Sequence, residues 1–168
     1  MPEVYVDRGI IHNSALACFL LSLFAQKYEL EDPEFPLDLL KLQMVLPFVW
    51  NESCRNALGK RTARTRFDTV LRESPELKVD LERRVFSHTA VTFQGLNLAV
   101  SSKIIEVTHS PSEAPVVRFI LERWPHGTKS ALPSEMVTTV NRLANWYSEI
   151  DTPILIKLLF GIPHEISH

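Results

Sequence analysis

The chain has 168 residues, of which 45% are hydrophobic and 23% are charged. These proportions are ordinary for a globular protein, so they exclude disorder of the whole chain, and the length predicts a single domain over residues 1–168. The net charge of −2 excludes a general electrostatic attraction to nucleic acid or to an anionic membrane, and either kind of binding would need a local patch.

The first informative feature along the chain is a run without charged side chains over residues 9–26. Its centre, residues 15–25, is apolar almost all round, so a helix there needs a cover on every side. A membrane is not that cover, because the strongly apolar part is about 11 residues long and a membrane-spanning helix needs roughly 20. Either the rest of this chain or a partner protein must therefore bury the run.

Local signals predict two helices in this region. Asn13 or Ser14 can cap a first helix over about 14–28 by accepting a hydrogen bond from a backbone N–H. Pro36 suits the first turn of a second helix, which is also largely apolar. Pro47 is expected to kink or end that second helix, because proline lacks the N–H that the next turn would use.

The next segment, residues 55–66, is basic. It carries five cations and no acid: Arg55, Lys60, Arg61, Arg64 and Arg66. Such a cluster can contact phosphates of a nucleic acid or an acidic surface of a partner protein. The alternative is a solvated loop and helix start with no binding role, since charge runs often have none.

Three helices and a β-hairpin are predicted in the middle of the chain. The first expected helix ends near residue 73, and the other two cover 75–86 and 89–101. The expected strands are 103–108 and 116–121, and a loop over 109–115 connects them. Two helices leading into a hairpin are the element order of a winged-helix unit. That order is structural and does not establish DNA binding.

The C-terminal third is predicted to hold two further helices, over about 133–150 and 153–160. The short apolar helices at the two ends of the chain either pack on each other in the core or expose part of their surface to a helix or sheet of a partner. In the second case, aromatic side chains would be the interface anchors. The candidates are Phe19, Phe24, Trp146 and Phe160.

The expected fold class is therefore mainly α with a small β-hairpin, in a single domain. We expect an N-terminal helical pair over 13–50, a winged-helix-like unit over 64–121 and a C-terminal helical pair over 133–163. The middle unit would be flanked by the apolar N- and C-terminal helices.

No catalytic constellation is recognisable, and we expect that the chain is not an enzyme and has no catalytic, cofactor-binding or metal-binding residues. The six histidines include one pair at i, i+4 spacing, His164 and His168 at the very end, and no glycine-rich phosphate loop occurs. A third hypothesis is a small enzyme using Cys54, expected in a polar turn. The two cysteines are too few for a disulfide framework, which favours a reducing compartment and a cytoplasmic protein.

Three blocks, taken in order, resemble one family. They are the helix Asn13–Tyr28, the Leu46-Pro47 pair before the basic turn with Arg55, and a final block from Arg142 to Pro163 that contains Asn145-Trp146-Tyr147 and Asp151-Thr152-Pro153. Together they are similar to the middle component of the ABC-three-component systems, which includes the small subunit of the Lamassu anti-phage systems. The resemblance covers about residues 11–163. Two departures are Ser14, where the family often has proline, and a longer hairpin loop.

This resemblance implies a role that composition and spacing do not show. Such a subunit assembles with an ABC ATPase of the SMC type, expected to be a dimer, and contacts an effector, often a nuclease. It would hold the effector inactive until the ATPase senses foreign DNA. ATP and Mg²⁺ would belong to the partner ATPase, so no cofactor is expected on this chain. Any contact with DNA would occur through the complex, and no membrane partner is expected. The alternative function is a winged-helix DNA-binding protein that uses the basic segment 55–66.

Overall fold

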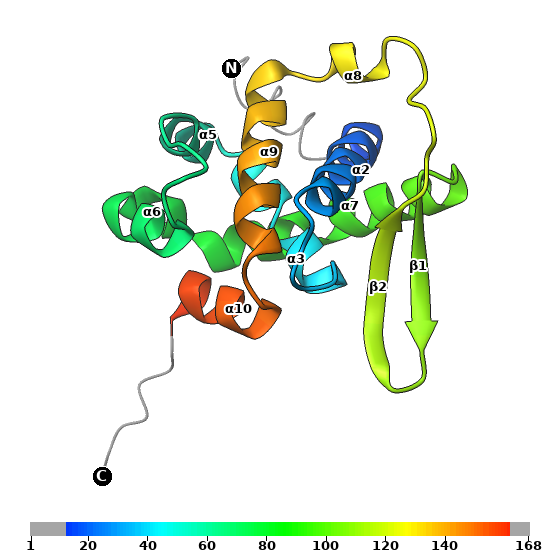
Figure 1. Cartoon of the computed structure of the whole chain (residues 1–168). Coiled ribbons are helices and arrows are strands. Elements are labelled where there is room, and N and C mark those ends of the chain that lie inside the picture. The colour runs from blue at the N-terminus through cyan, green and yellow to red at the C-terminus, as the bar shows by residue number, and fades with distance from the viewer. Residues whose placement is uncertain (1–12, 162–168) are drawn as a thin grey trace.

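The computed structural model describes residues 13–161 and is mainly helical with one two-stranded antiparallel hairpin, as expected (Figure 1). His164 and His168 lie outside the described residues. The elements are α2 (Ser14–Leu30), α3 (Leu39–Gln43), α4 (Leu46–Val49), α5 (Glu52–Gly59), α6 (Phe67–Glu73), the 3-10 helix η1 (Pro75–Lys78), α7 (Leu81–Ser101), β1 (Ile105–Ser110), β2 (Glu113–Phe119), α8 (Thr128–Ala131), α9 (Ser134–Ser148) and α10 (Thr152–Phe160). They surround one shared hydrophobic core.

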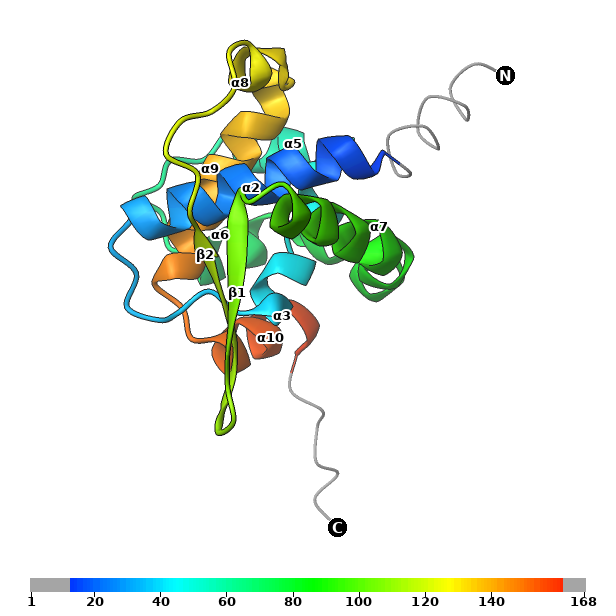
Figure 2. The ribbon, with the colours of Figure 1, turned by 90° about the vertical axis from the view of Figure 1, so that its right-hand side faces the viewer.

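The uncharged N-terminal run forms α2, the central helix of the fold. Asn13 caps it by accepting a hydrogen bond from the Leu16 N–H at 2.9 Å, as one of the two sequence alternatives predicted. Nine residues of α2 are buried, and the helix lies against both α7 and α9 (Figures 1 and 2). The cover that this apolar helix needs is therefore supplied by its own chain.

The second helix differs from its prediction. It begins after Asp38, whose carboxylate accepts a hydrogen bond from the Lys41 N–H at 2.9 Å, and not at Pro36. The reason is that the preceding segment is extended beside β2, where the Leu37 carbonyl accepts a hydrogen bond from the Val117 N–H at 2.8 Å. Pro47 does not end a helix either, because it lies in the first turn of α4, where no intrahelical N–H is needed.

The interruption expected at residues 87–89 is also absent, because α7 is continuous. Ser87 and Thr89 direct their hydroxyls back to carbonyl oxygens of the preceding turn, at 3.0 Å and 2.8 Å. Their polar groups are thus satisfied inside the helix and do not compete with it. The expected helix over 75–86 is instead η1 followed by Asp80 in the left-handed region and then the start of α7. The winged-helix assignment, which was based on two separate helices, stays a prediction.

The hairpin is longer and its loop is tighter than predicted. Ser110 pairs with Glu113, so residues 111–112 form the turn, and the loop expected over 109–115 is wrong. Pro115 is accommodated within β2 because it lies beside the register irregularity between Thr108 and Ser110, where a missing N–H costs little. The hairpin projects away from the helices (Figure 1).

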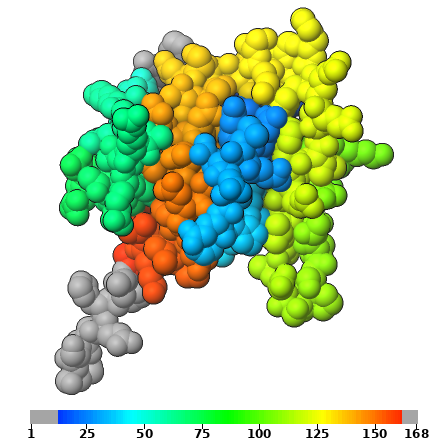
Figure 3. Space-filling model, viewed as in Figure 1, coloured from blue at the N-terminus to red at the C-terminus, as the bar shows by residue number. Residues whose placement is uncertain are grey.

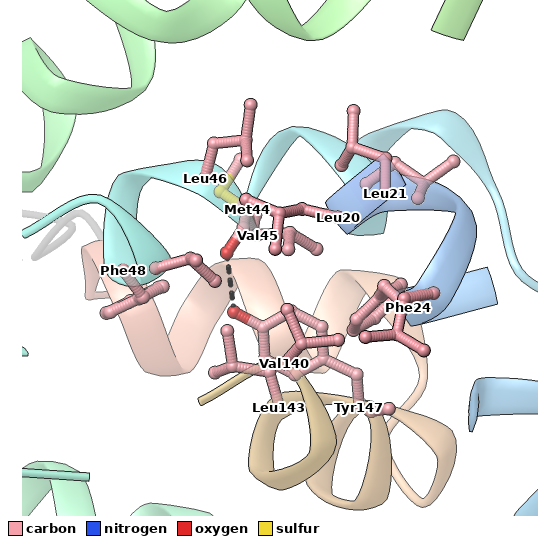
Figure 4. Close-up of a cluster of buried hydrophobic side chains, with 14 of the residues drawn as sticks. Leu20, Leu21, Phe24, Met44, Val45, Leu46, Phe48, Val140, Leu143 and Tyr147 are labelled. Carbon is pink, nitrogen blue, oxygen red and sulfur yellow. Dashed lines mark hydrogen bonds between the residues drawn. The ribbon is translucent and has the colours of Figure 1, made fainter. Parts of the chain in front are cut away.

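The C-terminal helices agree with the prediction. α9 has an apolar side facing the core, and the Tyr147 hydroxyl on that side donates a hydrogen bond to the Met44 carbonyl at 2.8 Å (Figure 4). Leu20, Leu21 and Phe24 of α2 lie in the same cluster as Leu46, Phe48, Val140 and Leu143. The apolar helices at both ends of the chain thus contribute to one core, with α10 beside α6 and α7.

Candidate partner-binding surfaces

Two of the four predicted interface anchors, Phe24 and Trp146, are buried. Phe24 is 0% and Trp146 is 2% exposed, and each is held by aromatic neighbours: Phe24 by Tyr147 with ring centroids 5.8 Å apart, and Trp146 by a stacked Phe67 at 5.2 Å. Both are core residues in this structure. They therefore cannot contact a partner in the conformation described.

Phe19 and Phe160 are partly buried. Phe19 lies near the ring of Trp124 with 6.4 Å between centroids, and Phe160 is at the end of α10. The structure does not bring the four aromatic side chains together on one surface.

The basic segment is partly neutralised within the chain. Arg55 donates a hydrogen bond to the Val49 carbonyl at 2.9 Å and lies 3.9 Å from a Glu135 oxygen. Arg61 pairs with the carboxylate of Glu73. Arg66 also lies 3.3 Å from a carboxylate oxygen of the neighbouring Asp68, but its side chain is 83% exposed, so this surface pair leaves Arg66 accessible.

Lys60 and Arg64 are exposed, and neither forms an ion pair with any residue between 13 and 161. Two separated cations can make few contacts with a DNA backbone. Because each phosphate contact adds its own increment to the affinity for DNA, the binding that they could support is weak. The DNA-binding alternative therefore has less free charge than the sequence indicated.

Cys54 is not in a polar turn but lies on α5 with its side chain 0% exposed. Burial raises the pKa of the Cys54 thiol above its usual range, although the guanidinium of Arg84, 3.4 Å from the sulfur, acts in the opposite direction. A buried thiol with a raised pKa holds little of the thiolate that a nucleophile requires.

A fully buried lysine connects α2, α3 and the loop between them. Lys41 Nζ donates a hydrogen bond to the Tyr28 hydroxyl at 2.8 Å, and that hydroxyl donates to the Phe35 carbonyl at 2.6 Å. Burial lowers the pKa of Lys41 to about 8, against the opposing attraction of Asp38 and Asp151. The same burial raises the pKa of Tyr28.

Between about pH 8 and pH 10, Lys41 contributes a rise in the free energy of unfolding, while the buried thiols of Cys18 and Cys54, whose pKa values are raised, contribute a fall. In that window folded Lys41 has released its proton while the unfolded chain still binds one, so a rise in pH favours the folded state, by about 1–3 kcal/mol. Above about pH 10 the raised pKa of Tyr28 reverses the trend, because only the unfolded tyrosine then ionises. Urea denaturation at several pH values measures this contribution as the difference in the free energy of unfolding between wild type and Lys41→Met, which should rise in favour of wild type across the window. A wild-type profile identical to that of Lys41→Met would contradict it.

Among the large hydrophobic side chains of residues 13–161, Phe86 on α7 is the most exposed, and no surface there was predicted from the sequence. Residues 85–102 form a second uncharged run of the same length as residues 9–26. Unlike the described part of the first run, residues 13–26, it leaves large apolar side chains exposed: Phe86 is 83% exposed, and Phe93 and Val100 are 37% and 42% exposed. We call this surface the outer face of α7, defined by Phe86, Ala90, Phe93, Asn97 and Val100.

The outer face of α7 is available to another molecule. In Figure 2, α7 lies at the edge of the coloured elements, and it is largely behind the face formed by α9, α2 and the hairpin in Figure 3. Several exposed apolar side chains along one helix face mark an interaction site more often than a single exposed side chain does. The absence of charge over 18 consecutive residues is the sequence signal that could have identified it.

Among the described residues 13–161, no helix has the length and apolar character needed to cross a membrane. No group of three or more histidine, cysteine, aspartate or glutamate side chains in this part of the chain is arranged to hold a metal ion.

The fold and its surfaces define a small, mainly helical protein with one exposed apolar helix face. Residues 9–163 match the model of a family described as ABC-three component (ABC-3C) system Middle Component 3, and the chain belongs to this family. No curated protein and no solved structure matches it. The resemblance to the middle components is thus confirmed, and the chain has partners among the other components of such a system, such as an ABC ATPase.

Proposed function

We propose that the chain is a non-enzymatic adaptor of a prokaryotic anti-phage defence complex of the Lamassu type. In this proposal it is a cytoplasmic subunit that links an SMC-like ABC ATPase dimer to an effector nuclease and holds the effector inactive until foreign DNA is sensed. ATP, Mg²⁺ and the cleavage chemistry belong to the partners. The family match supports the assignment to a multi-component system.

The observation that carries the adaptor role is the outer face of α7 on a chain of this family. Phe86 alone leaves 83% of its surface in contact with water, and covering apolar surface is the main driving force of protein association. Cys54, the nucleophile of the rival enzyme hypothesis, is buried with a raised pKa. Both observations favour a protein that binds other proteins over one that carries out chemistry.

Co-expression with the components encoded beside it tests the assembly. We expect an affinity tag on this chain to recover the ABC ATPase and the effector in a fixed ratio, in one peak of a size-exclusion column. If the tagged chain elutes alone as a stable monomer while both other components are soluble, the adaptor role is wrong.

Effector activity tests the inhibitory part separately. We expect the effector nuclease to cleave DNA in the absence of this chain and to be silent in the assembled complex before stimulation. Replacing Cys54 with serine is the matched control, and it should leave assembly and silencing intact. Loss of cleavage in Cys54→Ser with assembly preserved would favour the enzyme hypothesis.

A further inference from the structure

A groove lies between α9, α10, the start of α6 and the loop that follows α2. Its volume is about 470 Å³, which is within the range of about 300–1,000 Å³ that is typical of ligand-binding sites. Four apolar side chains from three separate stretches of the chain line it: Phe35, Ile150, Ile154 and Leu158. Because Ile154 is 53% exposed, this apolar lining is open to water.

Hydrogen bonds hold the walls of the groove in place. The Glu34 N–H donates to the Ser148 carbonyl at 3.3 Å, and the Tyr28 hydroxyl donates to the Phe35 carbonyl at 2.6 Å, so the loop is fixed against both α9 and α2. Trp146, which also lines the groove, is 2% exposed and belongs to the core. The groove is thus formed before any partner arrives, which lowers the entropic cost of binding to it.

The charged residues that line the groove are mostly acidic. One cation, Arg66, is accompanied by four carboxylates, those of Glu34, Asp68, Glu149 and Asp151. Arg66 lies 3.3 Å from Asp68, whereas the other three carboxylates form no ion pair with any residue between 13 and 161. The apolar lining is therefore bordered by unpaired negative charge.

Two further cations lie near the groove but do not line it. Lys41 Nζ is 5.5 Å from the centroid of the Phe35 ring, but this side chain is fully buried and donates to the Tyr28 hydroxyl. Lys157 is exposed on α10, but the residues of that helix that line the groove are Ile154 and Leu158. A partner in the groove therefore meets three unpaired carboxylates and one paired guanidinium.

This combination of charge and apolar lining restricts the chemistry of the partner. A phosphate backbone, an anionic lipid headgroup or an acidic protein segment would be repelled by the unpaired carboxylates. A lysine or arginine side chain would instead form charge-assisted hydrogen bonds with them. Its methylene groups and a neighbouring apolar side chain would cover the apolar lining.

We infer that this groove binds a basic segment of another component of the ABC-three-component system. The segment places a large apolar side chain against Ile154 and Leu158, and lysine or arginine side chains against Glu34 and Glu149. An adaptor that joins two partners needs two surfaces, and the groove shares no residue with the outer face of α7. In Figure 3, α9 lies on the face shown, whereas α7 is largely behind it. This inference rests on the proposed adaptor function.

The first test reverses the charge of the groove in the complete co-expressed system, with Glu34→Lys and Glu149→Lys combined in one chain. Both side chains are exposed, so the melting temperature of the isolated chain should not change. We expect recovery of one partner component to fall at least about tenfold. Glu113→Lys combined with Glu122→Lys is the matched control, because these two exposed acids lie outside the groove, and its complex should be recovered in full.

The second test concerns the apolar lining. Ile154→Gln removes an apolar contact without changing the charge, and we expect recovery of the same component to fall about fivefold. Ile120→Gln is the matched control, because Ile120 is 41% exposed and lies outside the groove. Loss of the component in both controls as well as in both groove variants would show that the groove has no special role.

An apolar photo-crosslinking amino acid at Ile154 then identifies the occupant. We expect crosslinks to one segment of another component that carries lysine or arginine beside the crosslinked residue. Changing those cations to glutamate should restore recovery of the chain with Glu34→Lys and Glu149→Lys. Crosslinks to a segment without cations, or to a second copy of this chain, would overturn the inference.

Full recovery of the complex with the charge-reversed groove would also overturn the inference. That result would leave the adaptor function intact with its binding surfaces elsewhere. Failure of the wild-type complex to form refutes the adaptor function itself.

Discussion

Replacing Gly95 with valine lowers the free energy of unfolding by about 3 kcal/mol or more. Gly95 lies where α7 crosses α2, and a Cβ there would be 2.8 Å from the Ala17 Cβ and 2.9 Å from the Cys18 backbone nitrogen. Because the second atom belongs to the backbone of a buried helix, no side-chain rotation relieves the clash. The two longest helices must then separate, and most of the core contacts between them are lost.

Gly59→Val is the matched control for this prediction. Gly59 is exposed at the end of α5, and a Cβ added there would meet no atom within 4 Å. The same substitution should therefore change the free energy of unfolding by less than about 1 kcal/mol. Urea denaturation followed by circular dichroism measures both variants. Equal midpoints for the two variants would show that α2 and α7 are not in close contact.

Replacing Trp146 with alanine is expected to cost about 3–5 kcal/mol. The indole is 2% exposed, stacks on Phe67, and donates a hydrogen bond from Nε1 to the Thr65 carbonyl at 2.8 Å. Truncation leaves a large cavity at the junction of α9 and α6 and an unpaired carbonyl beside it.

Trp146→Phe separates the contributions of packing and hydrogen bonding. A phenyl ring retains most of the stacking on Phe67 but loses the hydrogen bond, so the expected cost is about 1–3 kcal/mol. The sequence had indicated Trp146 as an anchor for a partner. An anchor role predicts the opposite pattern, namely an isolated Trp146→Ala chain of wild-type stability that no longer binds its partners, and that result would contradict the core assignment.

Elements with local start and stop signals could be predicted from the sequence. Asn13 or Ser14, inside the uncharged run, predicted the start of α2, and the Asp151-Thr152-Pro153 turn predicted the start of α10. Where the signal was a proline, the prediction often failed. Pro36, Pro47 and Pro115 each lack a backbone N–H and therefore disfavour regular structure, but an extended segment, a first helical turn and a strand irregularity respectively accommodate them.

The binding surfaces were harder to predict, because burial depends on residues distant in the sequence. α7 is apolar on several sides, and only the structure shows that Val91 and Leu96 face the core while Phe86 faces water. The neutralisation of the basic segment depends likewise on partners far along the chain, since Arg55 lies near Glu135. Composition identified the basic segment as unusual but could not assign its neighbours.

The most direct test of the adaptor role is to omit this chain from the assembly. The ABC ATPase and the effector are co-expressed with and without it, and complexes recovered through a tag on the ATPase are weighed by native mass spectrometry. The adaptor role predicts that the effector is recovered with the ATPase only when this chain is present. It also predicts that the effector is lost from the recovered complex when this chain carries Phe86→Glu, which alters the outer face of α7. Equal recovery of the effector in the absence of the chain would contradict it.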